Sequence, residues 1–231
     1  IIAKMGIKTE ARKIMREAGL PIVPGTETPV QGIEEVKKVA KEVGYPIMLK
    51  ALAGGGGKGM RLVRSEEEAE TALRLSQSEA GTSFGNDAVY IEKYIENPHH
   101  IEVQIMGDKY GNVVHLGERE CSIQRRNQKV IEESPSPFVK DETRKKMLKV
   151  AVEACKRIGY YSAGTLEFMM DKDQNFYFLE MNTRLQVEHP VTEECTGVDL
   201  VRDMITVAAG NPLPYKQEDI KFSGAAIECR I

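Results

Sequence analysis

The stretch Glu180-Met-Asn-Thr-Arg-Leu-Gln-Val-Glu-His189 decides how this chain is interpreted. It follows an apolar run, Asn175–Leu179, whose alternating faces predict a β-strand. Just upstream, Gly164–Met170 predicts a second strand, and the charged residues 171–174 predict the turn of a hairpin between the two. The polar residues of the stretch therefore lie directly against a hydrophobic strand pair.

Three oxygen-bearing side chains should converge at the open ends of these two strands, namely Glu167, Glu180 and Asn182. Two carboxylates and an amide suit Mg²⁺ or Mn²⁺, which usually retain waters and phosphate oxygens as further ligands. Arg184 and Glu188 follow closely, so a guanidinium and a carboxylate base should lie beside the metal. The alternatives are a solvated charged hairpin and a structural Arg184–Glu188 ion pair, and the adjacent strand pair disfavours the former.

Size and composition exclude several classes of protein. The chain has 231 residues, of which 41% are hydrophobic and 29% charged, as in an ordinary globular protein with a substantial core. The net charge of −3 argues against a nucleic-acid partner, and no apolar run approaches the roughly 20 residues of a membrane span. The start, Ile1–Gly6, has neither a signal-peptide pattern nor an initiator Met, so we expect a piece of a longer chain.

The four cysteines are widely spaced and form no CxxC pair, which argues against a zinc site or a disulfide framework. They favour a reducing compartment, either the cytoplasm or the mitochondrial matrix. Packing is a simpler explanation for them than catalysis.

Three segments are expected along the chain. Residues 1–21 should form an N-terminal helix and linker, residues 22–94 a small lobe of strands and helices, and residues 95–231 a larger lobe truncated at its end. The fold class is therefore α+β. Hydrophobic periodicity and terminating glycines or prolines predict helices over 8–18, 34–43, after Ser65, over 140–158 and 199–209, and strands over 45–50, 60–64, 88–95, 101–106, 112–118 and 224–231.

A glycine-rich loop, Lys50-Ala-Leu-Ala-Gly-Gly-Gly-Gly-Lys-Gly59, is the second strong feature. Successive glycines let backbone N–H groups approach an anion such as a polyphosphate closely. A P-loop is excluded because Lys58 is followed by Gly59, and a dinucleotide fingerprint is excluded because a strand rather than a helix follows. The remaining interpretations are a glycine hairpin that closes over phosphates, with Lys50 in reach of them, and a plain surface loop.

These features together resemble an ATP-grasp domain, and more specifically the ATP-grasp core of a biotin carboxylase. The resemblance extends in order over essentially the whole chain. It rests on the segments Lys50–Met60, Glu92–Pro98 with His100, Glu118–Lys129, Glu180–Thr192 and Glu228–Ile231. It implies two α+β lobes with ATP bound between them.

The resemblance also implies a role for individual residues. ATP would be contacted by Lys8, Lys50, Gly56, Gly57 and Met60, the adenine by Glu92, Lys93 and Ile95, and the ribose or phosphates by His100 and Gln124. Glu167, Glu180 and Asn182 would hold Mg²⁺ or Mn²⁺. Lys129 would bind the γ-phosphate and bicarbonate, Arg184 would bind bicarbonate with the backbone of Gln186 and Val187, Glu188 would deprotonate it, and Arg230 would stabilise negative charge on biotin.

The implied activity is the Mg-ATP-dependent conversion of bicarbonate to carboxyphosphate, followed by carboxylation of biotin on a carrier protein. A carboxyltransferase component and a homo-oligomer are the further expected partners. This sequence has Ile7 where the family usually has Asp or Ser, and Asn127 where some members have His, so no histidine role is assigned there. The family's other lobes, which complete the biotin site and the dimer interface, are absent.

Two rival functions stay open at this point. One is another ATP-grasp ligase, such as a carbamoyl-phosphate or amino-acid ligase, against which the Arg184–Glu188 string argues. The other is a non-catalytic nucleotide-binding or interaction fragment, which the missing flanks favour. The final carboxyl acceptor is not encoded in this segment.

Overall fold

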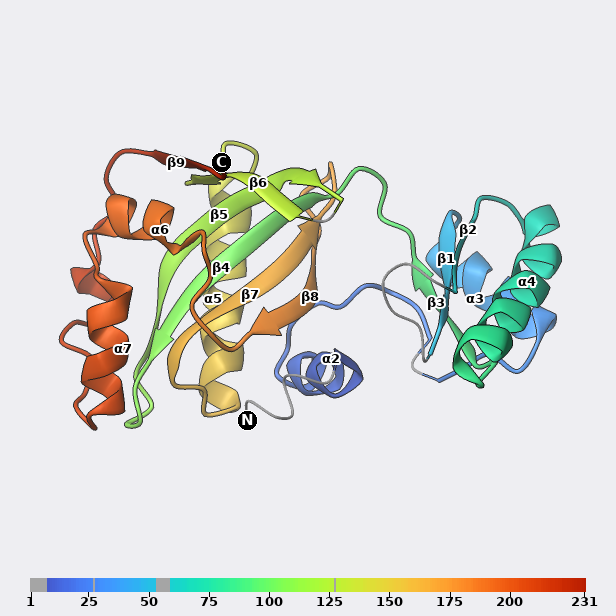
Figure 1. Ribbon diagram of the computed structural model, residues 1–231, viewed down its shortest axis with the longest axis horizontal. Helices are drawn as coiled ribbons and strands as arrows, with labels where there is room; N and C mark the ends of the chain where they lie inside the picture. Colours follow the sequence, from blue (N-terminus) through green and yellow to red (C-terminus); the bar gives the residue numbers. More distant parts are fainter. Residues whose placement is uncertain (1–7, 27, 53–58, 127) are drawn as a thin grey trace. The chain divides into compact units, whose positions relative to one another are not determined.

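The computed structural model describes residues 8–26, 28–52, 59–126 and 128–231 (Figure 1). The chain divides into two compact units. The small unit comprises Val23–Glu96, and the large unit comprises the described residues up to Ile22 together with Asn97–Ile231. No helix in the described part of the chain is both long and apolar enough to cross a membrane.

The small unit is a three-stranded antiparallel sheet covered by two helices. Its strands β1 (Ile47–Ala51), β2 (Met60–Val63) and β3 (Val89–Lys93) have the order β2-β1-β3. Alternation along β1 buries Ile47, Leu49 and Ala51 against α3 (Ile33–Val43) and α4 (Glu66–Phe84), and turns Lys50 to the opposite face.

The large unit is built on a six-stranded antiparallel sheet with the order β8-β7-β4-β5-β6-β9. The bounds of its strands are β4 His99–Gly107, β5 Val113–Arg125, β6 Gln128–Ser134, β7 Ser162–Met170, β8 Phe176–Asn182 and β9 Ala226–Cys229. Its helices are α2 Lys8–Glu17, α5 Asp141–Arg157, α6 His189–Thr196 and α7 Leu200–Ala208, with a short 3₁₀ turn at Gln217–Asp219.

The two faces of β4 have different surroundings. Ile101, Val103 and Ile105 pack in a core with α2 and α5, and Figure 1 shows α5 running behind the sheet. The even-numbered residues point to the other face, where Met106 joins a second apolar cluster with α7. Because side chains alternate along a strand, the other even-numbered residues of β4 share this face, and they are polar.

A β-bulge in β5 changes which residues reach this polar face. Val103 pairs with Glu118 whereas Ile105 pairs with His115, so β5 has one more residue than β4 across this interval. Gly117, with a φ of 79°, lies within the interval. As a result Leu116 and Arg119 share one face of the sheet, while Glu118 turns toward α5 and contacts Arg144.

The expected strand hairpins and long helices are present with ends shifted by a few residues, but one expectation was wrong and one strand was missed. Glu167 lies in the middle of β7 and Glu180 within β8, so neither is at an open strand end. The strand β6 was not predicted, because only tertiary pairing with β5 and β9 makes its charged sequence a strand.

Candidate active site

The centre of the large unit is a row of four charged side chains across four neighbouring strands. Arg119 on β5 is paired with Glu102 on β4, Glu102 with Glu167 on β7, and Glu167 with Glu180 on β8. Residues directly opposite in an antiparallel sheet point to the same face and lie close together. Three neighbouring carboxylates repel one another, so the row requires positive charge.

Arg119 in the row supplies part of this charge, and two further basic side chains supply the rest. The Lys129 ammonium, projecting from β6, contacts Glu102 and lies 2.9 Å from the Glu167 carboxylate and 2.6 Å from that of Glu188. His100 Nε2 lies 3.1 Å from a carboxylate oxygen of both Glu102 and Glu167. The three carboxylates hold the Lys129 ammonium in place. An anionic substrate that enters the site would meet this cation.

The ionisation of the row follows from these contacts. Burial would raise the pKa of Glu102, but the hydrogen bond from His100 and the charges of Arg119 and Lys129 hold that pKa well below its usual range. The same balance lowers the pKa of Glu167. Burial would lower the pKa of His100, yet the two carboxylates raise it to about 9. The same carboxylates raise the pKa of Lys129 above its usual value despite burial, so both side chains are cations near neutral pH.

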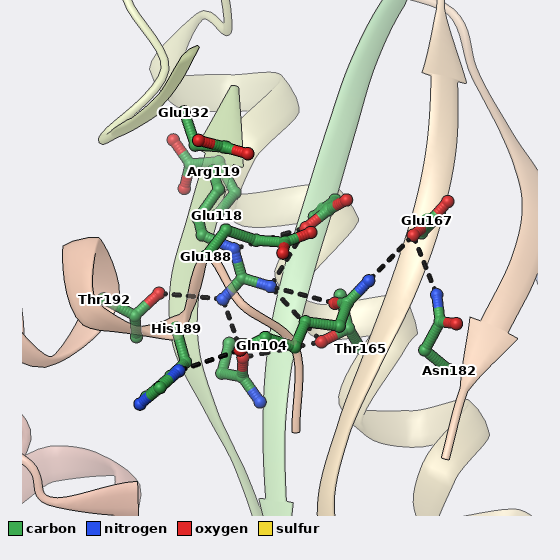
Figure 2. Close-up of polar contacts among 12 residues, drawn as sticks. Gln104, Glu118, Arg119, Glu132, Thr165, Glu167, Asn182, Glu188, His189 and Thr192 are labelled. Atoms are coloured by element: carbon green, nitrogen blue, oxygen red, sulfur yellow. Dashed lines mark hydrogen bonds and ion pairs between the residues drawn. The ribbon is translucent and has the colours of Figure 1, made fainter. Parts of the chain in front are cut away.

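A second row, of neutral polar side chains, lies beside the charged one. Gln104 is paired with Thr165, and Thr165 with Asn182. Asn182 Nδ2 donates to Glu167 Oε1 at 2.7 Å, and its amide oxygen accepts from Arg184 at 3.4 Å. These contacts fix the Glu167 carboxylate from the side of β8, as Figure 2 shows.

The segment between β8 and α6 carries the other predicted catalytic groups. Glu188 is 2% exposed and bridges two cations, Lys129 at 2.6 Å and Arg230 at 2.8 Å. Arg230 also pairs with the buried Glu132 at 2.6 Å. Arg184 and Glu188 form no ion pair in the described part of the chain, because Arg184 is exposed and donates to the Leu185 carbonyl instead. The structural-salt-bridge alternative for this pair is therefore wrong.

Other predicted residues of the large unit lie at the edge of this cluster. Gln186 is 5% exposed and donates to Glu167 at 3.0 Å, whereas Val187 is 59% exposed. Gln124, at the far end of β5, donates to the Cys121 carbonyl at 2.8 Å. His189 Nδ1 lies 2.8 Å from the Gln186 carbonyl, a contact that ties the start of α6 to the preceding segment.

In the small unit, Lys50 and Glu92 form a partly buried ion pair between β1 and β3. The Lys93 ammonium donates to the Gly44 and Tyr45 carbonyls at 2.8 and 2.9 Å, and the Lys93 N–H donates to Pro24. Ile95 is 9% exposed, and Met60 is 41% exposed at the start of β2. Gly56 and Gly57 lie outside the described residues, as does Ile7, and the side chain of Lys8 is likewise outside what the structure describes.

Sequence reasoning missed Glu102 and Arg119, which are both fully buried. The available signal was the strand His99–Gly107, whose odd positions Ile101, Val103 and Ile105 are apolar. Its even positions 100, 102 and 104 are His, Glu and Gln. Polar residues at period two on an otherwise hydrophobic strand indicate a lined site rather than a solvated face when the strand is central in its sheet.

The donor chemistry of this cluster fits a hard divalent cation. Ligand atoms of His100, Glu102 and Glu167 lie within 4.8 Å of one another, and Glu180 is opposite Glu167 on the same face. Carboxylate oxygens with few soft donors suit Mg²⁺ or Mn²⁺ better than zinc. Glu167, Glu180 and Asn182 are the residues that would hold the ion.

Comparison with known proteins gives consistent matches. The family model described as "Carbamoyl-phosphate synthase L chain, ATP binding domain" matches residues 8–216. The chain is 56% identical over 231 residues to biotin carboxylase 1 of Bacillus subtilis, covering all of this chain and 51% of the relative. It is 56% identical over 230 residues to the mouse mitochondrial propionyl-CoA carboxylase alpha chain, covering 32% of that protein.

Solved structures give the same result. The biotin carboxylase domain of Hydrogenobacter thermophilus 2-oxoglutarate carboxylase, a dimer in complex with MgADP, ADP and bicarbonate, is 55% identical with a TM-score of 0.83. That match covers 99% of this chain and 51% of that one. A bicarbonate-bound biotin carboxylase domain of a thermophilic 2-oxoglutarate carboxylase is 52% identical over 99% of this chain and 50% of that one, with a TM-score of 0.93. The chain thus spans about half the length of the first relatives it matches.

Proposed function

Since the chain belongs to the family described as carbamoyl-phosphate synthase L chain, ATP binding domain, we propose that it is the ATP-grasp core of a biotin carboxylase. Its substrates would be Mg-ATP, bicarbonate and biotin on a carrier protein. Residues 22–94 would act as the lid lobe and residues 95–231 as the catalytic lobe. The observation that carries the proposal is Glu188, a buried carboxylate held between Lys129 and Arg230 beside the acidic row.

The first step needs charge neutralisation more than covalent catalysis. A bicarbonate oxygen attacks the γ-phosphorus of ATP and the bond to ADP breaks, which yields carboxyphosphate. A divalent ion held by Glu167 and Glu180 would neutralise phosphate oxygens and orient them. Lys129 would stabilise the charge shared by the transferring phosphoryl group and bicarbonate, which its position among three carboxylates supports.

Glu188 is suited to remove the bicarbonate proton, because bicarbonate is a poor nucleophile until it is deprotonated. Arg184, exposed at the start of the same segment, would present its planar guanidinium to the planar anion. In the second step the carboxyl group passes to N1′ of biotin and phosphate is released. Arg230, 2.8 Å from Glu188, would stabilise the negative charge on biotin during this transfer.

Nucleotide binding would use residues of the small unit and the start of the chain. Lys8, Lys50, Gly56, Gly57 and Met60 would contact ATP, and Glu92, Lys93 and Ile95 would hold the adenine. In the large unit, His100 and Gln124 would reach the ribose or phosphates, and the backbone of Gln186 and Val187 would assist bicarbonate binding. The 55% identity to a biotin carboxylase domain in complex with MgADP, ADP and bicarbonate supports these assignments.

The partners would be a biotin carrier protein, a carboxyltransferase component and a second copy of the chain. One matched biotin carboxylase domain is described as a dimer, which supports the last of these. The compartment would be the cytoplasm or the mitochondrial matrix. Four free cysteines and relatives from bacteria and from mitochondria support that location.

The test is ADP release from Mg-ATP by the 231-residue chain, with and without bicarbonate and free biotin. Glu188→Gln is compared with Glu194→Gln, which alters an exposed carboxylate of α6. We expect release that depends on bicarbonate, that falls at least about 100-fold in Glu188→Gln, and that is unchanged in Glu194→Gln. Release driven by another acceptor would favour a different ATP-grasp ligase, and saturable ATP binding without turnover would favour the non-catalytic fragment.

A further inference from the structure

Arg119, like Glu102, is a residue of the charged row to which the proposed reaction assigns no role. It is completely buried in the centre of the sheet, where an arginine is costly unless its donors are satisfied. Burial would lower the pKa of this guanidinium, but the charge of Glu102 outweighs it, so the side chain remains a cation. A buried cation with no substrate contact calls for a physical explanation.

All five N–H donors of Arg119 are used. Nε and Nη2 donate to Glu102 at 3.3 and 3.0 Å, and Nη1 donates to Gln104 at 2.6 Å. Nη2 also donates to Thr165 at 3.3 Å. These three acceptor residues lie on β4 and β7, so these hydrogen bonds tie the guanidinium to the strands that carry Glu102 and Glu167.

The same guanidinium also forms hydrogen bonds with residues outside the sheet. Nη1 donates to the Thr192 hydroxyl on α6 at 3.0 Å, and Nη2 donates to Gln186 Oε1 at 3.2 Å. Figure 2 shows the Arg119 guanidinium directed toward Thr192 and toward the side chains in front of β4. A single planar group therefore connects the sheet to residues on both sides of Glu188, namely Gln186 before it and Thr192 after it.

Gln186 extends this connection to the metal-binding side of the row. Its oxygen accepts from Arg119 and its Nε2 donates to Glu167 Oε1 at 3.0 Å, so the amide bridges a cation and a carboxylate that are not in contact with each other. With both ends fixed, the amide can adopt only one orientation. The position of Glu167 then depends on Arg119 through one intervening side chain.

We propose that Arg119 is the positioning residue of this site, and that through Gln186 and Thr192 it fixes the segment 184–188 against the acidic row. The inference rests on the proposed function for its kinetic consequence. The general base and the metal ligand come from different segments, and misplacing a reacting group by about 1 Å can cost a 100-fold loss of rate. Only a forked cation with five donors can hold both segments, because lysine offers a single point charge.

The alternative is that Arg119 merely balances the charge of Glu102, as any buried ion pair must. Both explanations predict lower stability when Arg119 is replaced. They differ in where the structure loosens, because a charge-balancing role would weaken the whole sheet, whereas a positioning role would release the segment 184–188.

The test uses Arg119→Lys, which keeps the positive charge but loses the fork. Its matched control is Arg144→Lys, which also removes an arginine fork in the large unit. The hydrogen bonds of Arg144 go to Glu118, to Asp141 and to the carbonyls of Ser136 and Val139, outside the site. Gln186→Leu, close in shape but unable to form either hydrogen bond, interrupts the proposed connection, and the double variant Arg119→Lys/Gln186→Leu completes the cycle.

The first measurement is amide hydrogen exchange of the 231-residue chain, which does not depend on activity. In Arg119→Lys we expect exchange to rise at least about tenfold in peptides covering 183–192 and to stay unchanged in α5 peptides, whereas Arg144→Lys should leave exchange in 183–192 unchanged. A uniform rise across the sheet, or no rise in 183–192, would overturn the proposal.

The second measurement is kcat for bicarbonate-dependent ADP release. We expect each single variant to lose about 10- to 100-fold in kcat with little change in the KM for ATP, and the double variant to be no worse than the poorer single one. Additive losses would show that Arg119 does not act through Gln186. If the wild-type chain does not turn over, the proposed function fails for this chain, and the exchange result alone decides the positioning role.

Discussion

Glu102 and Glu167 lie directly opposite each other on β4 and β7, and both Lys129 and His100 contact both carboxylates. Two adjacent buried acids are thus bridged by two cations on the polar face of the central sheet. When a metal–nucleotide complex enters this cluster, new ion pairs replace existing ones, so no charge has to be buried without a partner. The cluster therefore maintains its acids in the ionised form that a cation needs.

Replacing Lys129 with Met should abolish most of the proposed activity. The ammonium is the group placed to meet transferring phosphoryl oxygens, so we expect bicarbonate-dependent ADP release to fall at least about 100-fold. Lys149→Met is the control, since Lys149 is an exposed residue of α5 with a side chain that is 75% accessible. Steady-state rates within threefold of this control would contradict a catalytic role for Lys129.

Replacing Glu167 with Gln should weaken divalent metal binding. The substitution removes one negative charge from the row while keeping the shape of the side chain, so we expect the Mn²⁺ dissociation constant to rise at least about tenfold. Electron paramagnetic resonance of free Mn²⁺ measures it directly. Glu153→Gln on α5 alters a carboxylate that is 51% exposed and should leave the constant unchanged. Equal affinity in both variants would place the metal elsewhere.

The small unit should not tolerate a side chain at Gly25. A Cβ there would lie 2.1 Å from the Ile91 carbonyl oxygen and 2.9 Å from the Cα of Glu92. Because backbone atoms cannot move aside cheaply, we expect Gly25→Ala to lower the free energy of unfolding by about 3 kcal/mol. Gly32→Ala is the matched control, since a Cβ at Gly32 meets nothing within 4 Å and its φ of 166° is extended backbone. Urea unfolding of both variants tests this, and equal midpoints would be incompatible with the close approach.

Stability should fall in mild acid because of His115. Burial lowers the pKa of this imidazole to about 4 from 6.5, and its Nδ1 accepts from the Gly117 N–H. Between these two values the unfolded chain binds the proton and the folded chain does not, so stability rises with pH across this window and is complete above about 6.5. The contribution is at most about 3 kcal/mol. Urea unfolding at pH 4.5, 5.5 and 7 should show a shallower pH dependence for His115→Gln, and identical slopes would contradict the assignment.

The sequence was informative where local rules and burial agree. Alternation around Glu167 and Glu180 predicted a strand pair with acidic side chains, and β7 and β8 place those residues opposite each other. The run of polar residues at 118–120 carried no such signal, because the burial of Arg119 depends on acceptors from β4, β7 and α6 that are distant in sequence. The charged sequence of β6 is likewise a strand only because it lies between β5 and β9.

Some site residues could be named from the sequence but not arranged. Arg184 and Glu188 were expected side by side, yet Glu188 is directed to Lys129 on β6 and to Arg230 just after β9. Spacing along a segment determines which residues are near one another in the chain. It does not determine which cations pair with a buried carboxylate, because those cations come from other parts of the fold.

The bulge in β5 has a consequence for how this site could change during evolution. Because one additional residue separates Leu116 from Arg119, the backbone count determines whether residue 118 or residue 119 faces Glu102. If the register of Ile105 and His115 continued without the bulge, Glu118 rather than Arg119 would lie opposite Glu102. The sign of the charge at the centre of the sheet therefore depends on the offset that the bulge introduces, and a deletion of Gly117 would remove the bulge and still leave Arg119 opposite Glu102.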